Sequence, residues 1–320
     1  MQINASPMKS VSTPTIQKRK KSVWRRMVQY KSLYLFLLPA VVYLAIFHYG
    51  PMYGVLIAFQ NFNGAKGIWG SDWVGLRHFE EFITGQNFWP IMSNTLSISL
   101  YTLIACFPFP IIVALCINEL KSKRYAKFVQ TVLYAPHFIS TVVLVGIIVL
   151  LLSPNTGLIN NLLALMGKER VYFMVQPSAF KHIYVWSGVW QSTGWSAIIY
   201  LAALSSVDPA LHEAAMIDGA NRLQRIWHIN LPTMKPTIVI LLIMKIGSLI
   251  GVGFEKAFLL QNSLNLEASE VISTYVYRRG LLQGGFSYSA AVGLFNTVIN
   301  IILLFIANSV AKKVNETSLF

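Results

Sequence analysis

Six long apolar runs, separated by short charged segments, constrain what this chain can fold into more than any other feature. Of its 320 residues, 55% are hydrophobic and 12% are charged, whereas soluble domains usually carry about 25% charged residues. Each run is long enough to cross about 30 Å of hydrocarbon, and the runs cover Leu33–Phe59, Thr95–Ile117, Phe128–Leu152, His182–Leu204, Thr237–Leu260 and Ser289–Ala311. We therefore predict an all-α polytopic membrane protein with about six transmembrane helices.

The first run is longer than a span requires, and it contains Pro39 and the sequence Gly50–Pro51. We expect a tilt, a kink or a break near Gly50–Pro51. Serine, glycine and proline residues in the second and fourth runs favour contact with other helices or with water over contact with lipid.

Lysine and arginine residues indicate how the spans are oriented. The formal net charge of +14 would suggest nucleic acid only if it formed a surface stripe. With the N-terminus inside, inner segments hold 17 of these residues and outer loops hold 7. The bias predicts both termini in the cytoplasm, a basic, lipid-attracted tail over residues 1–31, and a six-span domain over residues 32–320 with an inner loop at 205–236.

Motifs for catalysis and for metal binding are missing from the sequence. It contains no GxxxxGK[ST] phosphate loop, no HExxH helix and no GxSxG elbow. Cys106 and Cys116 lie about 15 Å apart if they share one helix, which is too far for a disulfide. We therefore predict a subunit without catalytic or metal residues and without its own ATPase site, whose energy comes from a partner.

The inner loop has the residues of a rigid helical elbow. Asp208–Pro209 suits the start of a helix, which we predict to run to Ile217. Asp218–Gly219 makes the corner, because glycine adopts the left-handed conformation that ends a helix. This half of the loop therefore predicts a short helix with a defined stop.

A second short helix is predicted to follow the corner. Asn221 and Gln224 have the spacing of a capping box, Leu231–Pro232 would end the helix, and Pro236 would precede the fifth span. Two interpretations follow from the pattern: a capped hairpin packed against its own chain, or an elbow gripped by another protein.

Seven positions of this loop resemble a known motif. The pattern Glu-Ala-Ala, three residues, Gly, nine residues, Ile-x-Leu-Pro resembles the EAA motif of binding-protein-dependent ABC importer permeases. The matching residues are Glu213, Ala214, Ala215, Gly219, Ile229, Leu231 and Pro232. The resemblance implies the type I importer permease architecture, in which the first helix of the motif is a coupling helix that docks in a groove of a cytoplasmic ATPase.

Carried over to this chain, the resemblance gives each motif residue a role. Glu213 is the charged contact, Ala214 and Ala215 form the close-packing surface, and Asp218–Gly219 is the turn. One departure is Ile226, where many members of the family have phenylalanine; it keeps an apolar anchor.

Other segments look like the carbohydrate branch of this family, the maltose-type and multiple-sugar permeases. These segments are Gly50–Gly54, Asp72–Phe79 and Val271–Leu281. Within that branch the chain looks most like Gram-positive permeases for complex plant-polysaccharide oligosaccharides of the polygalacturonan or rhamnogalacturonan type.

The family also implies a set of partners in a bacterial plasma membrane. They are a second permease subunit, often non-identical, two ATPase subunits that carry ATP and magnesium, and an extracellular solute-binding lipoprotein. The chain itself would bind no cofactor and no nucleic acid, and would contact membrane lipids and an oligosaccharide.

Three ionisable residues in the fifth run mark a candidate substrate path. They are Lys245 near mid-depth and Glu255 and Lys256 nearer the outer end, and such residues are costly inside a span unless they serve a function. Lys256 can also reach outward to the interface, and Glu255 can pair with another helix. The functional interpretation places Lys245 and Glu255 in a water-filled cavity, where a lysine suits a uronic-acid oligosaccharide.

Aromatic and amide side chains in the fourth run suit sugar binding. Sugars stack on aromatic rings and need amide or carboxylate partners for their hydroxyls, which favours a path along Trp190, Gln191 and Trp195. The competing interpretation is that tryptophans mark the interface belt, as Trp186 does in our assignment.

An ion- or proton-coupled secondary carrier is the alternative function. Such a carrier needs intramembrane carboxylates and repeated halves. Glu255 is the one acidic residue clearly inside a predicted span, and the sequence has no second copy of the elbow. We therefore expect the importer permease.

Overall fold

The computed structural model describes residues 29–315, which fall into two compact units that divide after Gly54. Most of the predicted basic tail therefore lies outside the described residues. The first unit contains α2 (Lys31–Leu44), a π-helical turn η1 (Ala45–Tyr49) and α3 (Gly50–Met52), and the chain continues into a 3-10 helix η2 (Tyr53–Phe59). Lys31–Phe59 thus forms one helical segment of 29 residues, which changes its helix type around Gly50–Pro51 instead of breaking there.

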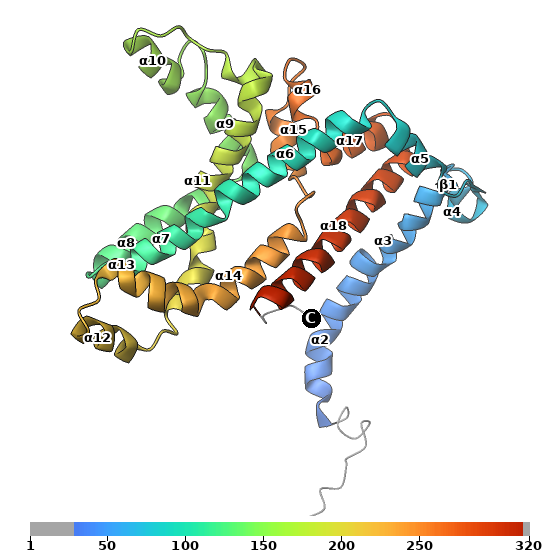
Figure 1. The fold of residues 1–320 in the computed structure, drawn as a ribbon. Helices are drawn as coiled ribbons and strands as arrows, with labels where there is room; N and C mark the ends of the chain where they lie inside the picture. Colours follow the sequence, from blue (N-terminus) through green and yellow to red (C-terminus); the bar gives the residue numbers. More distant parts are fainter. Residues whose placement is uncertain (1–28, 316–320) are drawn as a thin grey trace, which may run out of the picture. The chain divides into compact units, whose positions relative to one another are not determined.

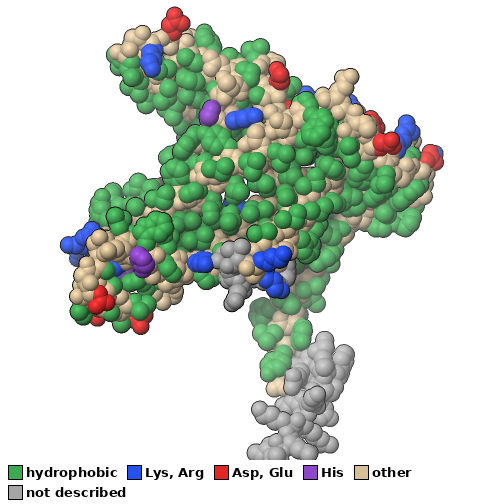
Figure 2. Space-filling view, viewed as in Figure 1, with side chains coloured by type: hydrophobic (Ala, Val, Ile, Leu, Met, Phe, Trp, Pro, Cys, Tyr) green, Lys and Arg blue, Asp and Glu red, His purple; other side chains and the backbone are tan. Residues whose placement is uncertain are grey.

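Membrane-length helices make up most of the second unit (Figure 1). Within residues 29–315, four helices are long and apolar enough to cross a membrane, or six if each of two bent helix pairs is one span. In the second unit these elements are α6 (Phe88–Cys106), α7 (Pro108–Asn118), α8 (Lys123–Tyr134), η3 (Ala135–Phe138), α9 (Thr141–Leu151), α11 (Pro177–Leu204), α12 (Pro209–Ile217), α13 (Arg222–Arg225), η5 (Ile226–Asn230), α14 (Leu231–Ile246) and α18 (Phe286–Asn315). Figure 2 shows hydrophobic side chains covering the middle of this unit, as a membrane-embedded surface requires.

The third predicted span is not continuous. Lys123–Phe138 and Thr141–Leu151 meet at an angle of 97°, so the span predicted over Phe128–Leu152 is a bent pair of helices, not one straight helix. Two local causes act together: Pro136 has no N–H to donate within a helix, and the Ser140 hydroxyl accepts a hydrogen bond from the Val143 N–H (3.3 Å), which starts a new helix.

The fifth predicted span also differs from the expected Thr237–Leu260. It begins earlier, because α13, η5 and α14 form one helix over Arg222–Ile246, so Leu231–Pro232 does not end the elbow's second helix. The π-helical turn η5 lies directly before Pro232, where the proline has no N–H to donate to a carbonyl of the preceding turn. At the other end the chain is uncoiled over residues 247–253 and resumes as α15 (Phe254–Leu260), because three glycines in seven residues disfavour a helix.

Short elements connect the long helices. They are β1 (Gln60–Asn61) paired antiparallel with β2 (Asp72–Trp73), α4 (Gly67–Gly70), α5 (Arg77–Thr84), α10 (Leu158–Leu165), η4 (Phe173–Val175), α16 (Leu266–Ser269), α17 (Ile272–Tyr277) and η6 (Arg278–Leu282). In Figure 1, α12 lies at the opposite end of the second unit from α5, α16 and α17. An ion pair between Arg278 and Glu270 stabilises that far end; burial raises the pKa of Glu270, and the Arg278 charge opposes the shift.

Helix α11 is central to the second unit. It packs against α6, α7, α8 and α14, and residues from it enter two apolar clusters: Val185 and Val189 in one, and Ala197, Tyr200 and Leu204 in the other. Since α12 follows α11 after four residues, the elbow is attached directly to the best-packed helix of the unit.

Candidate functional site

The elbow folds locally as its sequence predicts. The Asp208 carboxylate accepts a hydrogen bond from the Ala210 N–H (2.9 Å), and α12 bends away from α11 by 76°. Gly219 has a φ of +80°, and the Ala220 N–H donates to the carbonyl of Ala215 (2.8 Å), which is the hydrogen bond of a left-handed helix stop. The predicted start and stop of the first helix are confirmed.

The predicted capping box is also present. The Asn221 N–H donates to the Gln224 side chain (2.7 Å), and the Gln224 N–H donates to the Asn221 side chain (2.9 Å). The two reciprocal bonds fix the direction in which the chain leaves the corner. Ile229, Leu231 and Pro232 lie in the helix that continues from it.

The surface of α12 favours a partner over packing against its own chain. None of its nine residues is buried, Glu213 and Ala214 are exposed, and Ile217 is 86% exposed. Beside the helix stop, Ala215, Asp218, Gly219 and Ile229 contribute to a shallow cavity of about 290 Å³. A capped, rigid helix with exposed apolar side chains is the kind of surface that another protein covers.

Gly219→Val is expected to open the corner, because a left-handed conformation costs a residue with a Cβ about 1–2 kcal/mol. Limited trypsin digestion at Arg222 should become faster than in the unsubstituted protein. Gly219→Asn is the matched control, since asparagine tolerates this conformation, and its cleavage rate should stay near the original. Equal rates for the valine variant would show that the corner does not depend on glycine.

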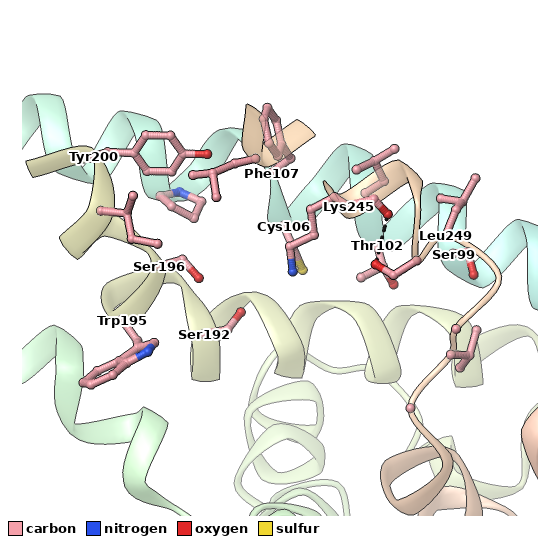
Figure 3. A pocket seen from close by; sticks show the side chains of 18 of the residues that line it. Ser99, Thr102, Cys106, Phe107, Ser192, Trp195, Ser196, Tyr200, Lys245 and Leu249 are labelled. Carbon is pink, nitrogen blue, oxygen red and sulfur yellow. Dashed lines mark hydrogen bonds between the residues drawn. The ribbon is translucent and has the colours of Figure 1, made fainter. Parts of the chain in front are cut away.

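A second feature is a cavity of about 660 Å³ between α6, α11, α14 and the uncoiled residues that follow α14 (Figure 3). Polar groups line it on several sides: Ser99, Thr102, Cys106, Ser192, Ser196, Tyr200, Lys245 and Ser248. The Oγ1 atom of Thr102 is buried and has no hydrogen-bond partner. The cavity therefore offers hydroxyl groups, a cation and apolar surface to a molecule inside it.

Two of the five residues proposed for the substrate path line this cavity. Lys245, close to the end of α14, points into it near Cys106 (Figure 3). Trp195 of α11 also lines it; one face of its indole is stacked on the His137 ring, with centroids 4.5 Å apart and planes 4° apart. The Trp195 residue as a whole is 44% exposed.

The other three residues lie outside the cavity lining. The Gln191 amide donates to the carbonyl of Ile139 (2.9 Å) and so supports the bend between α8 and α9. Trp190 is half-exposed on α11, and Glu255 is exposed in the first turn of α15. The structure therefore brings Lys245 and Trp195 together, without Trp190, Gln191 and Glu255.

Sequence reasoning missed most of the polar lining. Ser99, Thr102 and Cys106 recur three and four positions apart on α6, so they share one helix face. The same spacing on α11 places Ser192 and Ser196 together. This periodicity of small polar residues within apolar helices was the available signal, and it gave no indication of which faces meet.

Comparison with a protein family identifies the class of this architecture. A family model described as "Binding-protein-dependent transport system inner membrane component" matches residues 81–316. The match covers most of the second unit, including α12 and all the residues that line the cavity.

Curated relatives are similar over nearly the whole chain. The polygalacturonan/rhamnogalacturonan transport system permease protein YteP of Bacillus subtilis (strain 168) is 44% identical over 95% of each chain. Protein LplB of the same organism is 43% identical over 91% of each chain. The arabinooligosaccharides transport system permease protein AraP of that organism is 30% identical over 94% of this chain and 96% of its own.

Solved structures have the same fold. A chain in the crystal structure of a bacterial ABC transporter involved in the import of the acidic polysaccharide alginate aligns with a TM-score of 0.84 and 41% identity, over 92% of this chain and 99% of its own. A chain of the bacterial alginate ABC transporter in complex with an alginate pentasaccharide-bound periplasmic protein aligns with a TM-score of 0.85 and 40% identity, over 93% and 99%. The fold expected from the sequence is therefore confirmed.

Proposed function

The chain belongs to the family of inner membrane components of binding-protein-dependent transport systems, and we propose that it is the permease subunit through which such a system imports acidic oligosaccharides. As a permease subunit it performs no chemical step and lets solute pass by alternating access. Closure of a partner ATPase moves α12, and the spans attached to α12 then open the cavity to the opposite side.

The cavity supports an oligosaccharide as the cargo. Sugar hydroxyls need hydrogen-bond partners, and the C–H faces of the ring pack on aromatic side chains. The cavity offers Ser99, Ser192 and Ser196 for the first need and Trp195 for the second. The names of the relatives, which refer to polygalacturonan, rhamnogalacturonan, arabinooligosaccharides and alginate, agree with this substrate class.

The position of Lys245 in the cavity is the observation that supports an acidic cargo. An oligosaccharide that contains uronic acid has a carboxylate on each uronic-acid unit, and its transfer into a low-dielectric cavity is unfavourable unless a cation compensates the charge. The cavity lining holds Lys245 and, within the described residues, no aspartate or glutamate. Pectin-derived fragments are the oligosaccharides that we assign to it.

The proposed assembly contains partners on both sides of the membrane. A second, non-identical permease subunit completes the pathway, and an extracellular solute-binding lipoprotein delivers the oligosaccharide. Two ATPase subunits bind ATP and magnesium, and one of them grips α12 through Glu213 and the surface of Ala214 and Ala215. This arrangement places both termini in the cytoplasm, in agreement with the charge bias.

The secondary-carrier alternative is not favoured. An ion- or proton-coupled carrier uses carboxylates in the membrane to bind its coupling ion, whereas Glu255 lies on the surface of α15 outside the cavity. The relatives with printed functions are permeases of transport systems.

Co-purification tests the proposed function. When the affinity-tagged chain is expressed in its native host and purified, a second permease and an ATPase should co-purify with it. Adding the cognate binding protein loaded with tri-galacturonate should then raise the rate of ATP hydrolysis severalfold. Recovery of the chain alone, with transport that needs no ATPase, would refute the proposal.

A further inference from the structure

The uncoiled segment between α14 and α15, residues 247–253, forms one wall of the cavity. Ser248, Leu249, Gly251, Val252 and Gly253 all contribute to its lining. Backbone that leaves a helix at membrane depth loses its regular hydrogen bonds, and each unpaired group there costs several kcal/mol. Within the segment, the N–H groups of Gly247, Ser248, Leu249 and Gly251 bond to nearby backbone carbonyls, so side chains from other helices must satisfy the groups that remain.

Three side chains from three different helices do so. The Ile250 N–H donates to the Asn300 Oδ1 atom of α18 (3.0 Å), and the Gly253 N–H donates to the Tyr184 hydroxyl of α11 (3.2 Å). The Ser273 hydroxyl of α17 donates to the carbonyl of Val252 (3.1 Å). The segment is thus held from several sides by groups far away in the sequence.

Apolar packing holds the same segment at two residues, Ile250 and Val252. Ile250 is 3% exposed and belongs to an apolar cluster with Ile272 and Val292, whereas Val252 belongs to another cluster that contains Val185 of α11. The wall of the cavity therefore bridges two parts of the core.

Tyr184 is itself braced. The Lys256 ammonium donates to the carbonyl of Tyr184 (2.7 Å) and lies 4.7 Å from the centre of its ring. The hydroxyl that accepts from Gly253 is consequently fixed relative to both α11 and α15.

We propose that Tyr184 and Asn300 are positioning residues that clamp the uncoiled segment, so that this wall of the cavity moves with α11 and α18. The elbow lies between α11 and α14 in the sequence, and the Tyr184–Gly253 hydrogen bond joins α11, at the cavity, to the segment that follows α14. A displacement of α12 passed to α11 is therefore transmitted to the cavity wall. The link to transport rests on the proposed function, whereas the clamp itself does not.

Hydrogen exchange on the full chain, co-purified with its partner subunits and placed in lipid nanodiscs, tests the clamp. Tyr184→Phe removes the hydroxyl and keeps the ring, and Asn300→Leu removes the acceptor and keeps the side-chain volume. Each should accelerate amide exchange within residues 247–253 by about tenfold or more, because an amide left without its partner opens more readily. Asn300→Asp, which retains an acceptor oxygen, should restore slow exchange.

Asn296→Leu is the matched control on the same helix, since the buried Asn296 Oδ1 atom has no hydrogen-bond partner. In this variant, the rate of amide hydrogen exchange within residues 247–253 should equal that of the original protein. Unchanged exchange in both Tyr184→Phe and Asn300→Leu would overturn the clamp, and so would an equal acceleration in Asn296→Leu.

A second readout separates positioning from a purely structural role. With tri-galacturonate as the probe, Tyr184→Phe and Asn300→Leu should hydrolyse severalfold more ATP for each molecule imported, because the movement of α11 no longer carries the cavity wall. An unchanged ratio would overturn the transmission. If the unsubstituted complex does not import tri-galacturonate, the proposed cargo is wrong, and exchange within residues 247–253 still decides the clamp.

Discussion

Glu213→Lys is expected to reduce ATP-driven oligosaccharide uptake by at least about tenfold, because it reverses the charge at the contact that we propose between this carboxylate and the ATPase. Glu213 is exposed on a helix none of whose residues is buried in its own chain, so the substitution should leave folding and membrane insertion intact. Uptake into proteoliposomes and binding of the ATPase are the measurements, at equal amounts of inserted protein.

Glu169→Lys controls for the change in net charge. Glu169 is also exposed but lies in the loop between α10 and η4, far in sequence from the elbow. Oligosaccharide uptake by the Glu169→Lys variant should equal that of the original protein. If Glu213→Lys retains normal uptake and ATPase binding, α12 is not the surface that the ATPase grips.

Lys245→Met is expected to weaken transport of acidic oligosaccharides by about tenfold to a hundredfold, the effect of losing one charge-assisted hydrogen bond in a cavity. Neutral oligosaccharides of the same length should lose far less, since they have no carboxylate to compensate. The comparison requires kcat and KM for tri-galacturonate and for a neutral trisaccharide that the complex accepts.

Lys235→Met is the matched control on the same helix. Lys235 is exposed near the start of α14 and does not line the cavity, so its variant should transport both sugars normally. An equal loss of acidic and neutral transport in Lys245→Met would remove the argument for an acidic cargo.

Local signals in the sequence predicted the elbow in detail. The N-cap at Asp208, the left-handed Gly219 and the capping box at Asn221 depend on residues at most five positions apart. Their geometry is fixed by neighbours in the chain, so the sequence alone was sufficient. The same holds for the apolar runs, whose length reflects bilayer thickness.

Long-range interactions explain what the sequence did not predict. Hydropathy treats residues 237–260 as one apolar run, yet the helix stops at Ile246, since Asn300 and Tyr184 supply hydrogen bonds from 50 and 69 residues away. The bend before α9 likewise uses Gln191, 52 residues from Ile139. Local residues such as Pro136 and the glycines after α14 favour these breaks, and partners from other helices, which the sequence does not reveal, stabilise them.

The cavity was predicted in part for the same reason. Lys245 stood out because a charge within a span is costly, and Trp195 because of its chemistry, and both line the cavity. Glu255 satisfied the same criterion and lies on the surface, because the uncoiled segment separates α15 from α14. Small polar residues such as Ser99 and Thr102 are common at helix contacts, so their position in the lining required the packing of α6 against α11.

The most direct measurement of the central claim is uptake of tri-galacturonate by proteoliposomes that contain the chain with its partner permease and ATPase subunits. We predict uptake that requires both ATP on the ATPase side and the solute-binding protein on the other side, and that a proton ionophore does not abolish. Uptake driven by an ion gradient in the absence of ATP would contradict the assignment of this chain as an ATP-driven importer permease.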